Sequence, residues 1–282
     1  MARLDKRLGQ GRQDHQLPLL MGILNVTPDS FYDGGQYNTS ELALEHARTM
    51  VDSGVDVIDV GGESTRPGAD PISVEQEKDR VLPVVSRLVD TLSVPVSIDT
   101  SKASVADDAL RAGASMVNDV TGLEDPEMRS VVSDQQCYVC IMHMQGTPQT
   151  MQDNPTYESV VKDVKGFLKD RANTVVEAGL DPSNIILDPG IGFGKTLEHN
   201  RRLLTSVESI GELGYPVMIG HSRKSFIGDV LDREVDNRLS ATLGVSVDLM
   251  SQGVDLLRVH DVQEHSDIRR MYEWLGDTEG DG

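Results

Sequence analysis

Cysteine, aromatic residues and basic charge are all scarce in this sequence of 282 residues. Its two cysteines, Cys137 and Cys140, are too few for the disulfide framework of a secreted protein, and no early apolar run predicts a signal peptide or a membrane span. Their C-x-x-C spacing is typical of redox motifs, but they lie in the strand-like run CYVCIM, where positions three apart face opposite sides. We therefore expect that both pack in the core of a cytoplasmic protein.

Lysine and arginine number only 26, against 46 aspartate and glutamate residues, which gives a formal net charge of -20. Because this charge repels nucleic acid and anionic membranes, we expect neither as a partner. The acidic residues are spread along the chain, a pattern that suits a halophilic protein whose surface repulsion is screened by a salt-rich cytoplasm. An ordinary acidic mesophilic enzyme is the alternative.

Short apolar runs rich in β-branched residues recur along the chain, with longer helical patterns between them. The predicted strands are 19–24, 55–60, 94–98, 115–118, 138–142, 184–187, 216–219 and 254–259. One helix is predicted to begin after Ser40, a candidate N-cap. Further helices are predicted near 73–91, 102–112, 125–134, 157–178, 197–213, 237–251 and 262–275. Eight such units predict an α/β fold, a single-domain (β/α)8 TIM barrel over 18–275, between a polar N-terminal tail (1–17) and an acidic C-terminal tail (276–282). An open, doubly wound sheet is the structural alternative.

Polar residues follow nearly every predicted strand. In chain order they are Asn25, 61–66, Asp99, Asn118, His143, Asp188, 221–225, Arg258 and His260. In a barrel the carboxyl ends of all strands meet at one face, so residues far apart in the sequence become neighbours. The sequence therefore predicts an active site at this face.

The first two strands are followed by loops rich in Gly and Pro. In NVTPDSFYDGG (25–35), Asn25 offers a carbonyl oxygen suited to Mg²⁺, and Asp33 lies on a glycine-hinged segment that could swing over a ligand. GGESTRPGA (61–69) carries hydroxyls and one Arg, which could aim donors at an anion. A plain flexible loop and an ordinary capped turn are the respective alternatives.

Two further motifs indicate where a ligand binds. LDPGIGFGKT (187–196) is not a Walker A loop, because Pro189 stands where the first Gly is required, and its glycines do not fit the dinucleotide fingerprint. Asp188 remains, either as an acceptor of two parallel N–H bonds or as a capping residue. HSRKS (221–225) and RVHD (258–261) place cations at strand ends near helix starts, which favours a phosphate site over a solvated surface pair.

Six blocks, NVTPDSF, ESTRPGA, SIDTSK, LDPGIGFGK, SRKS and RVHD, occur in this order between about residues 19 and 262. Together they resemble the dihydropteroate synthase family, which has a pterin-binding barrel. The resemblance implies a transferase of folate biosynthesis that joins 6-hydroxymethyl-7,8-dihydropterin diphosphate to 4-aminobenzoate. It also implies Mg²⁺ as the cofactor and, through the outer helices, a homodimer.

The resemblance assigns site residues by matched position. The pterin pocket is expected at Asp99, Asn118, Asp188 and Lys224, with Arg258 on one wall. The diphosphate and its Mg²⁺ are expected at Asn25, the metal ligand, Arg258 and His260. Mobile loops are expected to contribute Phe31, Asp33 and Arg66, and 4-aminobenzoate is expected at Thr65, Pro67, Phe193, Lys224 and Ser225. The catalytic residues among these are Asp33, Arg66, Asp99 and Lys224, whereas His221 stands where many relatives have Phe.

Two rival functions remain open at this point. A pterin-binding methyltransferase domain would need a corrinoid-carrying partner in place of Mg²⁺ and diphosphate, and the cations Lys224 and Arg258 argue against it. A pterin-binding sensor or scaffold without turnover is the second, and the intact catalytic blocks argue against that reading.

Overall fold

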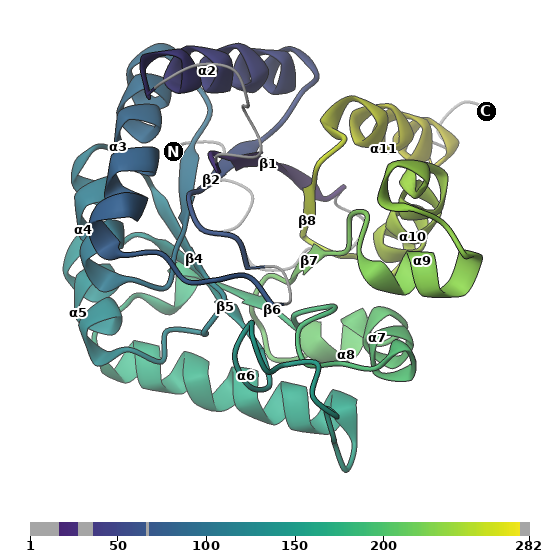
Figure 1. Cartoon of the computed structure of the whole chain (residues 1–282). Helices are drawn as coiled ribbons and strands as arrows, with labels where there is room; N and C mark the ends of the chain where they lie inside the picture. The colour runs from purple at the N-terminus through teal and green to yellow at the C-terminus, as the bar shows by residue number, and fades with distance from the viewer. Residues whose placement is uncertain (1–16, 28–35, 66–67, 277–282) are drawn as a thin grey trace, which may run out of the picture.

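The computed structural model describes residues 17–27, 36–65 and 68–276. Within these residues, eight parallel strands alternate with helices that surround them (Figure 1). The strands are β1 (Leu19–Asn25), β2 (Val57–Gly61), β3 (Val96–Asp99), β4 (Met116–Asp119), β5 (Tyr138–Met142), β6 (Ile185–Asp188), β7 (Met218–Gly220) and β8 (Leu256–Val259). Their hydrogen-bonded order is β6-β5-β4-β3-β2-β1-β8-β7, and a bridge from Leu187 to Val217 joins β6 to the residue before β7. This ring confirms the predicted TIM barrel and excludes the open sheet.

The helices cover the outside of the barrel. They are α2 (Gln36–Asp52), α3 (Val74–Thr91), α4 (Ala103–Arg111), α5 (Pro126–Gln135), α6 (Val160–Glu177), α7 (Leu197–Leu204), α8 (Val207–Gly211), α9 (Ser225–Leu231), α10 (Leu239–Ser251) and α11 (Val262–Gly276), with 3-10 turns at Pro182–Asn184 and Val235–Asn237. The tails predicted at 1–17 and 276–282 lie almost wholly outside the described residues, although α11 includes Gly276. No described helix combines the length and the apolar character needed to cross a membrane.

Two predictions about helices are wrong, and one helix was missed. Ser40 is not an N-cap, because an N-cap has non-helical backbone and Ser40 lies inside α2. The helix predicted over 197–213 is two helices, since the Gln252 side chain donates to the Leu204 carbonyl at the end of α7 and accepts the Val207 N–H at the start of α8 (2.8 and 3.2 Å). The short helix α9 was not predicted, although Phe226 on it is buried.

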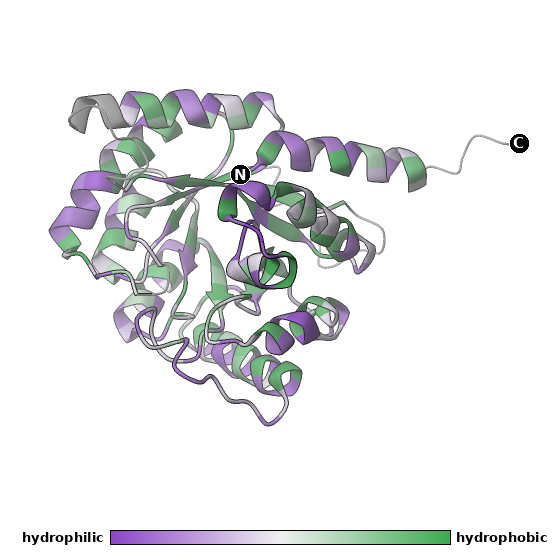
Figure 2. Ribbon diagram, turned by 45° about the vertical axis from the view of Figure 1, so that its right-hand side comes forward, coloured by the Kyte–Doolittle hydropathy of each residue, from purple (hydrophilic) through white to green (hydrophobic). Residues whose placement is uncertain are grey.

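Side chains alternate between the barrel interior and the layer under the helices, as the period of two along a strand requires. Green strands at the centre of Figure 2 reflect the apolar character of both layers. Cys140 belongs to the cluster inside the barrel, whereas Cys137 packs in the cluster between strands and helices. Both thiols are free and buried, which confirms the packing role predicted for them.

Candidate active site

The barrel interior changes from apolar to polar along each strand. Val57, Met116 and Leu256 belong to the interior apolar cluster, and the next inward positions on the same strands, two residues later, are Asp59, Asn118 and Arg258. These inward positions lie toward the carboxyl ends of the strands. Asn118 and Arg258, which were predicted at strand ends, therefore lie with Asp59 in a mouth above an apolar floor.

Arg258 links the acidic residues of this mouth. Its Nε donates to Oδ2 of Asp59 and its Nη2 to Oδ2 of Asp99, both at 2.6 Å. Asn118 Nδ2 donates to the same Asp59 oxygen at 2.9 Å. The structure thus brings together Asp99, Asn118 and Arg258, which were predicted, around Asp59, which was not. The available signal for Asp59 was a carboxylate at an inward position of the apolar run VDVIDV.

Burial and neighbouring charges alter the acidity of this group. Burial raises the pKa of Asp99 to about 7, the Arg258 guanidinium opposes the rise, and Asp59 adds to it. Burial alone would lower the pKa of Arg258, but Asp59 and Asp99 raise it above its ordinary value. The guanidinium is therefore a permanent cation, and the Asp99 carboxyl holds a proton more readily than an exposed aspartate does.

Asp188 and Lys224 lie on the opposite side of the mouth, at a glycine loop. The Gly190 N–H donates to Asp188 Oδ1 at 2.7 Å, so one carboxylate oxygen closes the turn after β6. A Cβ on Gly190, whose φ is +68°, would lie 1.9 Å from the His143 carbonyl oxygen, so the turn requires glycine. Burial raises the pKa of Asp188, while Lys224 opposes the rise. The capping role of Asp188 is real, and its second oxygen takes no part in that turn.

Lys224 crosses this loop and meets an aromatic ring. Its Nζ donates to the Ile191 carbonyl and lies 4.4 Å from the centre of the Phe193 ring, which is cation–π range. Burial lowers the pKa of Lys224 to about 8, and Asp188 opposes the decrease. Ser225 follows as the first, exposed residue of α9. Phe193 and Lys224, which were predicted together, thus share one side of the mouth, and Ser225 follows Lys224 in the chain.

A buried pair that the sequence did not predict supports the glycine loop from below. Lys195 Nζ lies 3.0 Å from His143 Nδ1 and donates to the Phe193 carbonyl at 2.8 Å. Burial lowers the pKa of His143 to about 3 and that of Lys195 well below its ordinary value. His143 therefore follows β5 as predicted, but its ring faces a lysine of the loop.

The cations of HSRKS do not act together, contrary to the paired-cation interpretation. Arg223 forms a two-point ion pair with Asp261 (2.8 and 2.6 Å), so its charge is neutralised beside β8. The neighbouring His260 has its Nδ1 3.0 Å from Ser222 Oγ. The cations of the mouth among the described residues are therefore Lys224 and Arg258.

His221 is fully buried behind the mouth. Its Nε2 lies 2.8 Å from Ser246 Oγ and 3.2 Å from the Thr242 carbonyl, both on α10. Burial lowers its pKa to about 3, so the ring is neutral at pH 7. His221 thus packs between β7 and α10 and supports the wall from outside.

The first two loops are only partly described. Asn25 ends β1, and Gly61 lies between it and Asp99, since a Cβ on Gly61 would be 3.5 Å from Asn25 Oδ1 and 3.7 Å from Asp99 Oδ2. Thr65 is partly buried at the start of the second loop. The predicted residues Phe31, Asp33, Arg66 and Pro67 lie outside the described residues.

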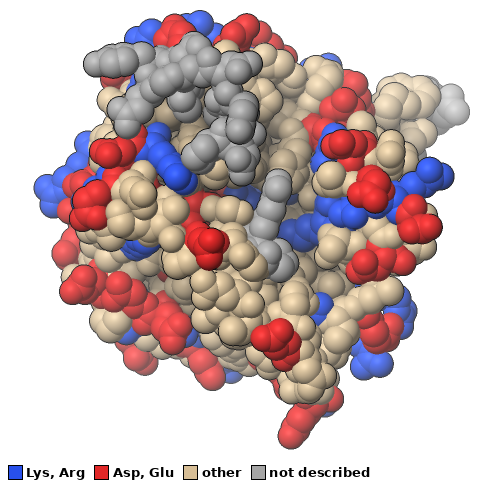
Figure 3. Space-filling model, viewed as in Figure 1, with Lys and Arg blue, Asp and Glu red and all other residues tan. Residues whose placement is uncertain are grey.

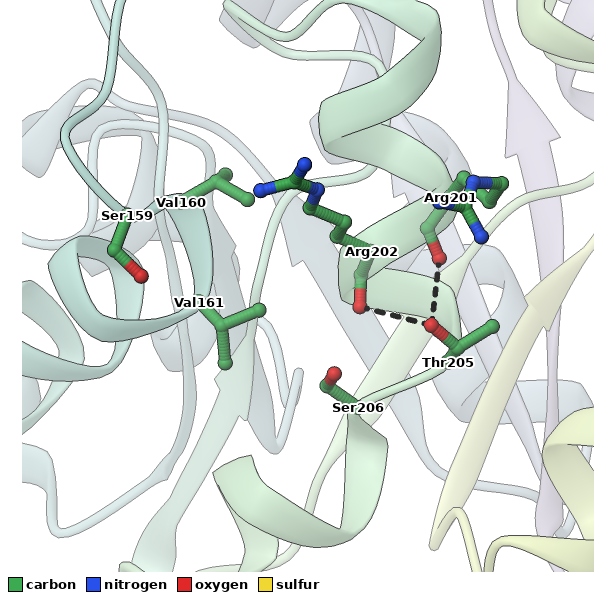
Figure 4. A pocket seen from close by; sticks show the side chains of 7 residues that line it. All are labelled: Ser159, Val160, Val161, Arg201, Arg202, Thr205 and Ser206. Atoms are coloured by element: carbon green, nitrogen blue, oxygen red, sulfur yellow. Dashed lines mark hydrogen bonds between the residues drawn. The ribbon is translucent and has the colours of Figure 1, made fainter.

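A separate hollow of about 260 Å³ lies on the outside, between the start of α6 and the end of α7 (Figure 4). Its lining is Ser159, Val160, Val161, Arg201, Arg202, Thr205 and Ser206. Thr205 Oγ1 bonds the carbonyls of both arginines, and Glu198 pairs with both guanidinium groups. Its lining includes none of the strand-end residues and its arginines are already paired with Glu198, so this hollow is not the candidate active site.

Comparisons with known proteins identify the family. A family model described as pterin binding enzyme matches residues 21–260. The dihydropteroate synthase of Haemophilus influenzae is 44% identical over 260 residues, which is 92% of this chain and 94% of that protein. The crystal structure of the Yersinia pestis dihydropteroate synthase with a sulfonamide drug complex superposes with a TM-score of 0.88 at 41% identity, over 93% of this chain and 96% of that one.

A Xanthomonas albilineans dihydropteroate synthase solved with 4-aminobenzoic acid also gives a TM-score of 0.88 at 41% identity, over 93% of this chain and 94% of that one. The family model includes every described residue of the mouth, from Asn25 to His260. The chain therefore belongs to the pterin binding enzyme family, among the dihydropteroate synthases.

Proposed function

We propose that this chain joins 6-hydroxymethyl-7,8-dihydropterin diphosphate to 4-aminobenzoate, releasing diphosphate and forming 7,8-dihydropteroate. The observation that carries the proposal is the mouth of the barrel, where Arg258 and Lys224 lie among Asp59, Asp99 and Asp188. Such a site offers acceptors for the N–H groups of a pterin and cations for its diphosphate. A pterin-binding methyltransferase, the rival hypothesis, would bind no diphosphate and would not need these cations.

The pterin ring is assigned to Asp99, Asn118, Asp188 and Lys224. Asp188 keeps one oxygen free of its turn, and that oxygen accepts N–H bonds from the amino-pyrimidinone edge. Lys224 supplies a donor on the same side, beside the Phe193 ring. Because these groups are held by strand ends and by a turn that admits only glycine, little ordering is needed on binding.

The diphosphate is assigned to Arg258 and His260, with Mg²⁺ held by Asn25. Only two of the five N–H donors of Arg258 are engaged by Asp59 and Asp99, so the others remain for phosphate oxygens. Mg²⁺ usually takes one or two protein oxygens and completes its shell with substrate phosphates and water. Asn25, at the rim beside Gly61, suits that role, and no described group of three His, Cys, Asp or Glu competes with it. When bound, Mg²⁺ would neutralise charge on the departing diphosphate.

The reaction needs no protein nucleophile. Arg258 and His260 stabilise the growing charge of the leaving diphosphate, while Asp99 and Asp188 favour the cationic pterin left behind. The neutral arylamine of 4-aminobenzoate then attacks the pterin methylene carbon, whose bond to the diphosphate has broken, from the side of Phe193 and Ser225, and the nitrogen releases a proton to the departing diphosphate or to solvent. By the family resemblance, Asp33, Thr65, Arg66 and Pro67 are also assigned to this reaction. Orientation and charge stabilisation supply most of the acceleration.

Incorporation of radiolabelled 4-aminobenzoate tests this function. The purified chain, given the pterin diphosphate and Mg²⁺, should convert label into dihydropteroate. A methyltransferase or a non-catalytic pterin sensor would bind the pterin but leave the label in free 4-aminobenzoate. A chain that binds the pterin but does not incorporate 4-aminobenzoate would therefore refute the proposed function.

We propose that the chain assembles as a homodimer through outer helices. Apolar side chains are exposed on α10 and α11, at Val247, Met271, Trp274 and Leu275. The last three follow a spacing of three and four residues and share one face of α11, whose end projects beyond the barrel in Figure 2. A second copy covering this face would bury it, and sedimentation velocity measures the resulting mass.

The setting, by proposal, is a salt-rich cytoplasm, with no nucleic acid partner. Two buried free thiols suit a reducing compartment. Red and blue residues are interspersed on the face drawn in Figure 3, without a basic patch that would attract a polyanion there.

A further inference from the structure

We propose that Asp59 is a positioning residue for pterin binding, because it fixes the side chains of Asn118 and Arg258 at the bottom of the mouth. This inference rests on the proposed function, since it explains how the pterin pocket keeps its shape. Asp59 itself lies beneath the ligand groups and acts through them.

Asp59 is central to the mouth. It points inward from β2 and is 0% exposed. A single oxygen, Oδ2, accepts from Asn118 on β4 and from Arg258 on β8. In the barrel order β4 lies two strands from β2 on one side, and β8 lies two strands away on the other. Asp59 therefore connects strands that are not paired by backbone bonds, across the interior of the barrel.

The bond to Asp59 fixes the orientation of the Asn118 amide. With one N–H of Nδ2 given to Asp59, the other N–H and the carbonyl oxygen remain in a plane whose direction is set. A donor beside an acceptor matches a ring edge that presents an acceptor beside a donor, the pattern of an aminopyrimidine. Without Asp59 the amide could rotate by a half turn, and its donor and acceptor would exchange places.

The same oxygen fixes Arg258. Asp59 accepts from Nε of the guanidinium and Asp99 accepts from Nη2. These two contacts fix the plane of the guanidinium. Asp99 alone would hold one point, around which the planar group could swing. The donors of Arg258 that face the substrate thus depend on Asp59 for their direction.

The burial of Asp59 is costly for a residue with a purely structural task. Its second oxygen, Oδ1, is buried and has no hydrogen-bond partner among the described residues. Buried ion pairs rarely stabilise a fold more than apolar side chains of similar size would, and apolar residues fill the inward positions just below, such as Val57. The partners of Asp59, the mouth residues Asn118 and Arg258, indicate that its role is to hold these two groups.

Asp56 provides a matched control on the same segment of chain. It is also buried, and its Oδ2 also binds an arginine, Arg269 of α11, at 2.5 Å, together with the Leu20 N–H at 2.9 Å. It precedes β2, however, and so lies at the amino end of the barrel, away from the mouth. Asp56→Asn and Asp59→Asn therefore remove the same charge from comparable ion pairs, one outside the mouth and one inside it.

The experiment measures the affinity of each protein for 6-hydroxymethyl-7,8-dihydropterin by titration calorimetry, together with its melting temperature. We expect both variants to melt lower than the wild type. Asp59→Asn should bind the dihydropterin about tenfold to a hundredfold more weakly, whereas Asp56→Asn should stay within about twofold of the wild type. If Asp59→Asn fails to fold, Asp59→Glu keeps the charge but displaces the oxygen, and the same loss is expected.

A second pair of variants tests whether Asp59 acts through Asn118. In an Asn118→Ala background, the effect of Asp59→Asn on dihydropterin affinity should shrink, because the group that it positions is gone. Equal affinity of Asp59→Asn, or of folded Asp59→Glu, and Asp56→Asn would overturn this inference alone. A wild-type chain that binds no dihydropterin would overturn the proposed function, and this inference with it.

Discussion

Replacement of Asp188 by Asn separates recognition of the pterin from support of the fold. The Gly190 N–H at 2.7 Å decides which way the new amide turns. With its oxygen on Gly190, the turn after β6 is preserved and the NH₂ group faces the pocket. The reverse orientation would set two donors against each other in the turn. Asp188→Asn should therefore fold, with a donor in the place where the pterin N–H groups arrive.

The cost follows from this mismatch. A hydrogen bond to a charged acceptor contributes about 1.5–3 kcal/mol, so its loss weakens pterin binding by roughly tenfold to 150-fold. The substitution also removes the carboxylate that opposes the decrease in the Lys224 pKa, which is about 8 in the wild type. Lys224 then loses its proton at a lower pH, so the defect in binding should grow as the pH rises through 7.

Calorimetric titration with 6-hydroxymethyl-7,8-dihydropterin, alongside thermal melting, measures both consequences, and the KM for 4-aminobenzoate should change less than the affinity for the pterin. Asp119→Asn is the matched control. Asp119 also ends a strand, but both of its carboxylate oxygens accept hydrogen bonds from N–H groups of its own turn, those of Thr121 and Leu123. The control should lose stability and keep pterin affinity. Should Asp188→Asn behave like this control, Asp188 is only a fold residue and the pocket has been misplaced.

Three further predictions concern the leaving group, the surface and the buried histidine. Arg258→Ala should lower kcat/KM for the pterin diphosphate and, by leaving Asp59 and Asp99 unpaired, reduce stability by about 3–5 kcal/mol; steady-state kinetics with an unchanged kcat/KM would remove Arg258 from the site. The melting temperature should rise steeply with KCl, since screening relieves repulsion among 46 carboxylates, and equal melting in dilute buffer and molar salt would refute the halophilic interpretation. His221 has its pKa lowered to about 3, so its unfolded form gains a proton below about pH 6.5 that the folded form does not, and stability falls by about 1.4 kcal/mol per pH unit down to about pH 3. Melting curves of His221→Phe across that window should be flatter than those of the wild type, and parallel curves would contradict this reasoning.

The pattern of apolar runs was sufficient to predict eight strands that alternate with helices, because the strand period and the helix period differ strongly. Closure into a barrel rather than an open sheet was established by the bridge between β6 and the residue before β7. Strand-end positions then placed Asp99, Asn118, Asp188 and Arg258 in one mouth without any knowledge of side-chain contacts. Their individual roles came from family resemblance and remain predictions.

Contacts between side chains far apart in the sequence could not be predicted from the sequence. Asp59 stands inside an apolar run, and its importance appears only when Arg258, 199 positions later, reaches it. Arg223 looked like a ligand for an anion until Asp261 was found to neutralise it. The single helix predicted over 197–213 is divided by Gln252, a residue of another segment. In each case a tertiary partner overrode a local pattern.

The two buried aspartates near β2 have a consequence for how the chain is made. Asp56 and Asp59 leave the ribosome early, but their arginines, Arg269 and Arg258, follow 213 and 199 positions later. Until then each carboxylate must stay in water or take up a proton, because burying its charge alone is very costly. The first half of the nascent chain therefore cannot reach its final packing early. The barrel closes only when synthesis is almost finished. A messenger truncated before the codon for Arg258 should yield a product that remains open and is readily degraded.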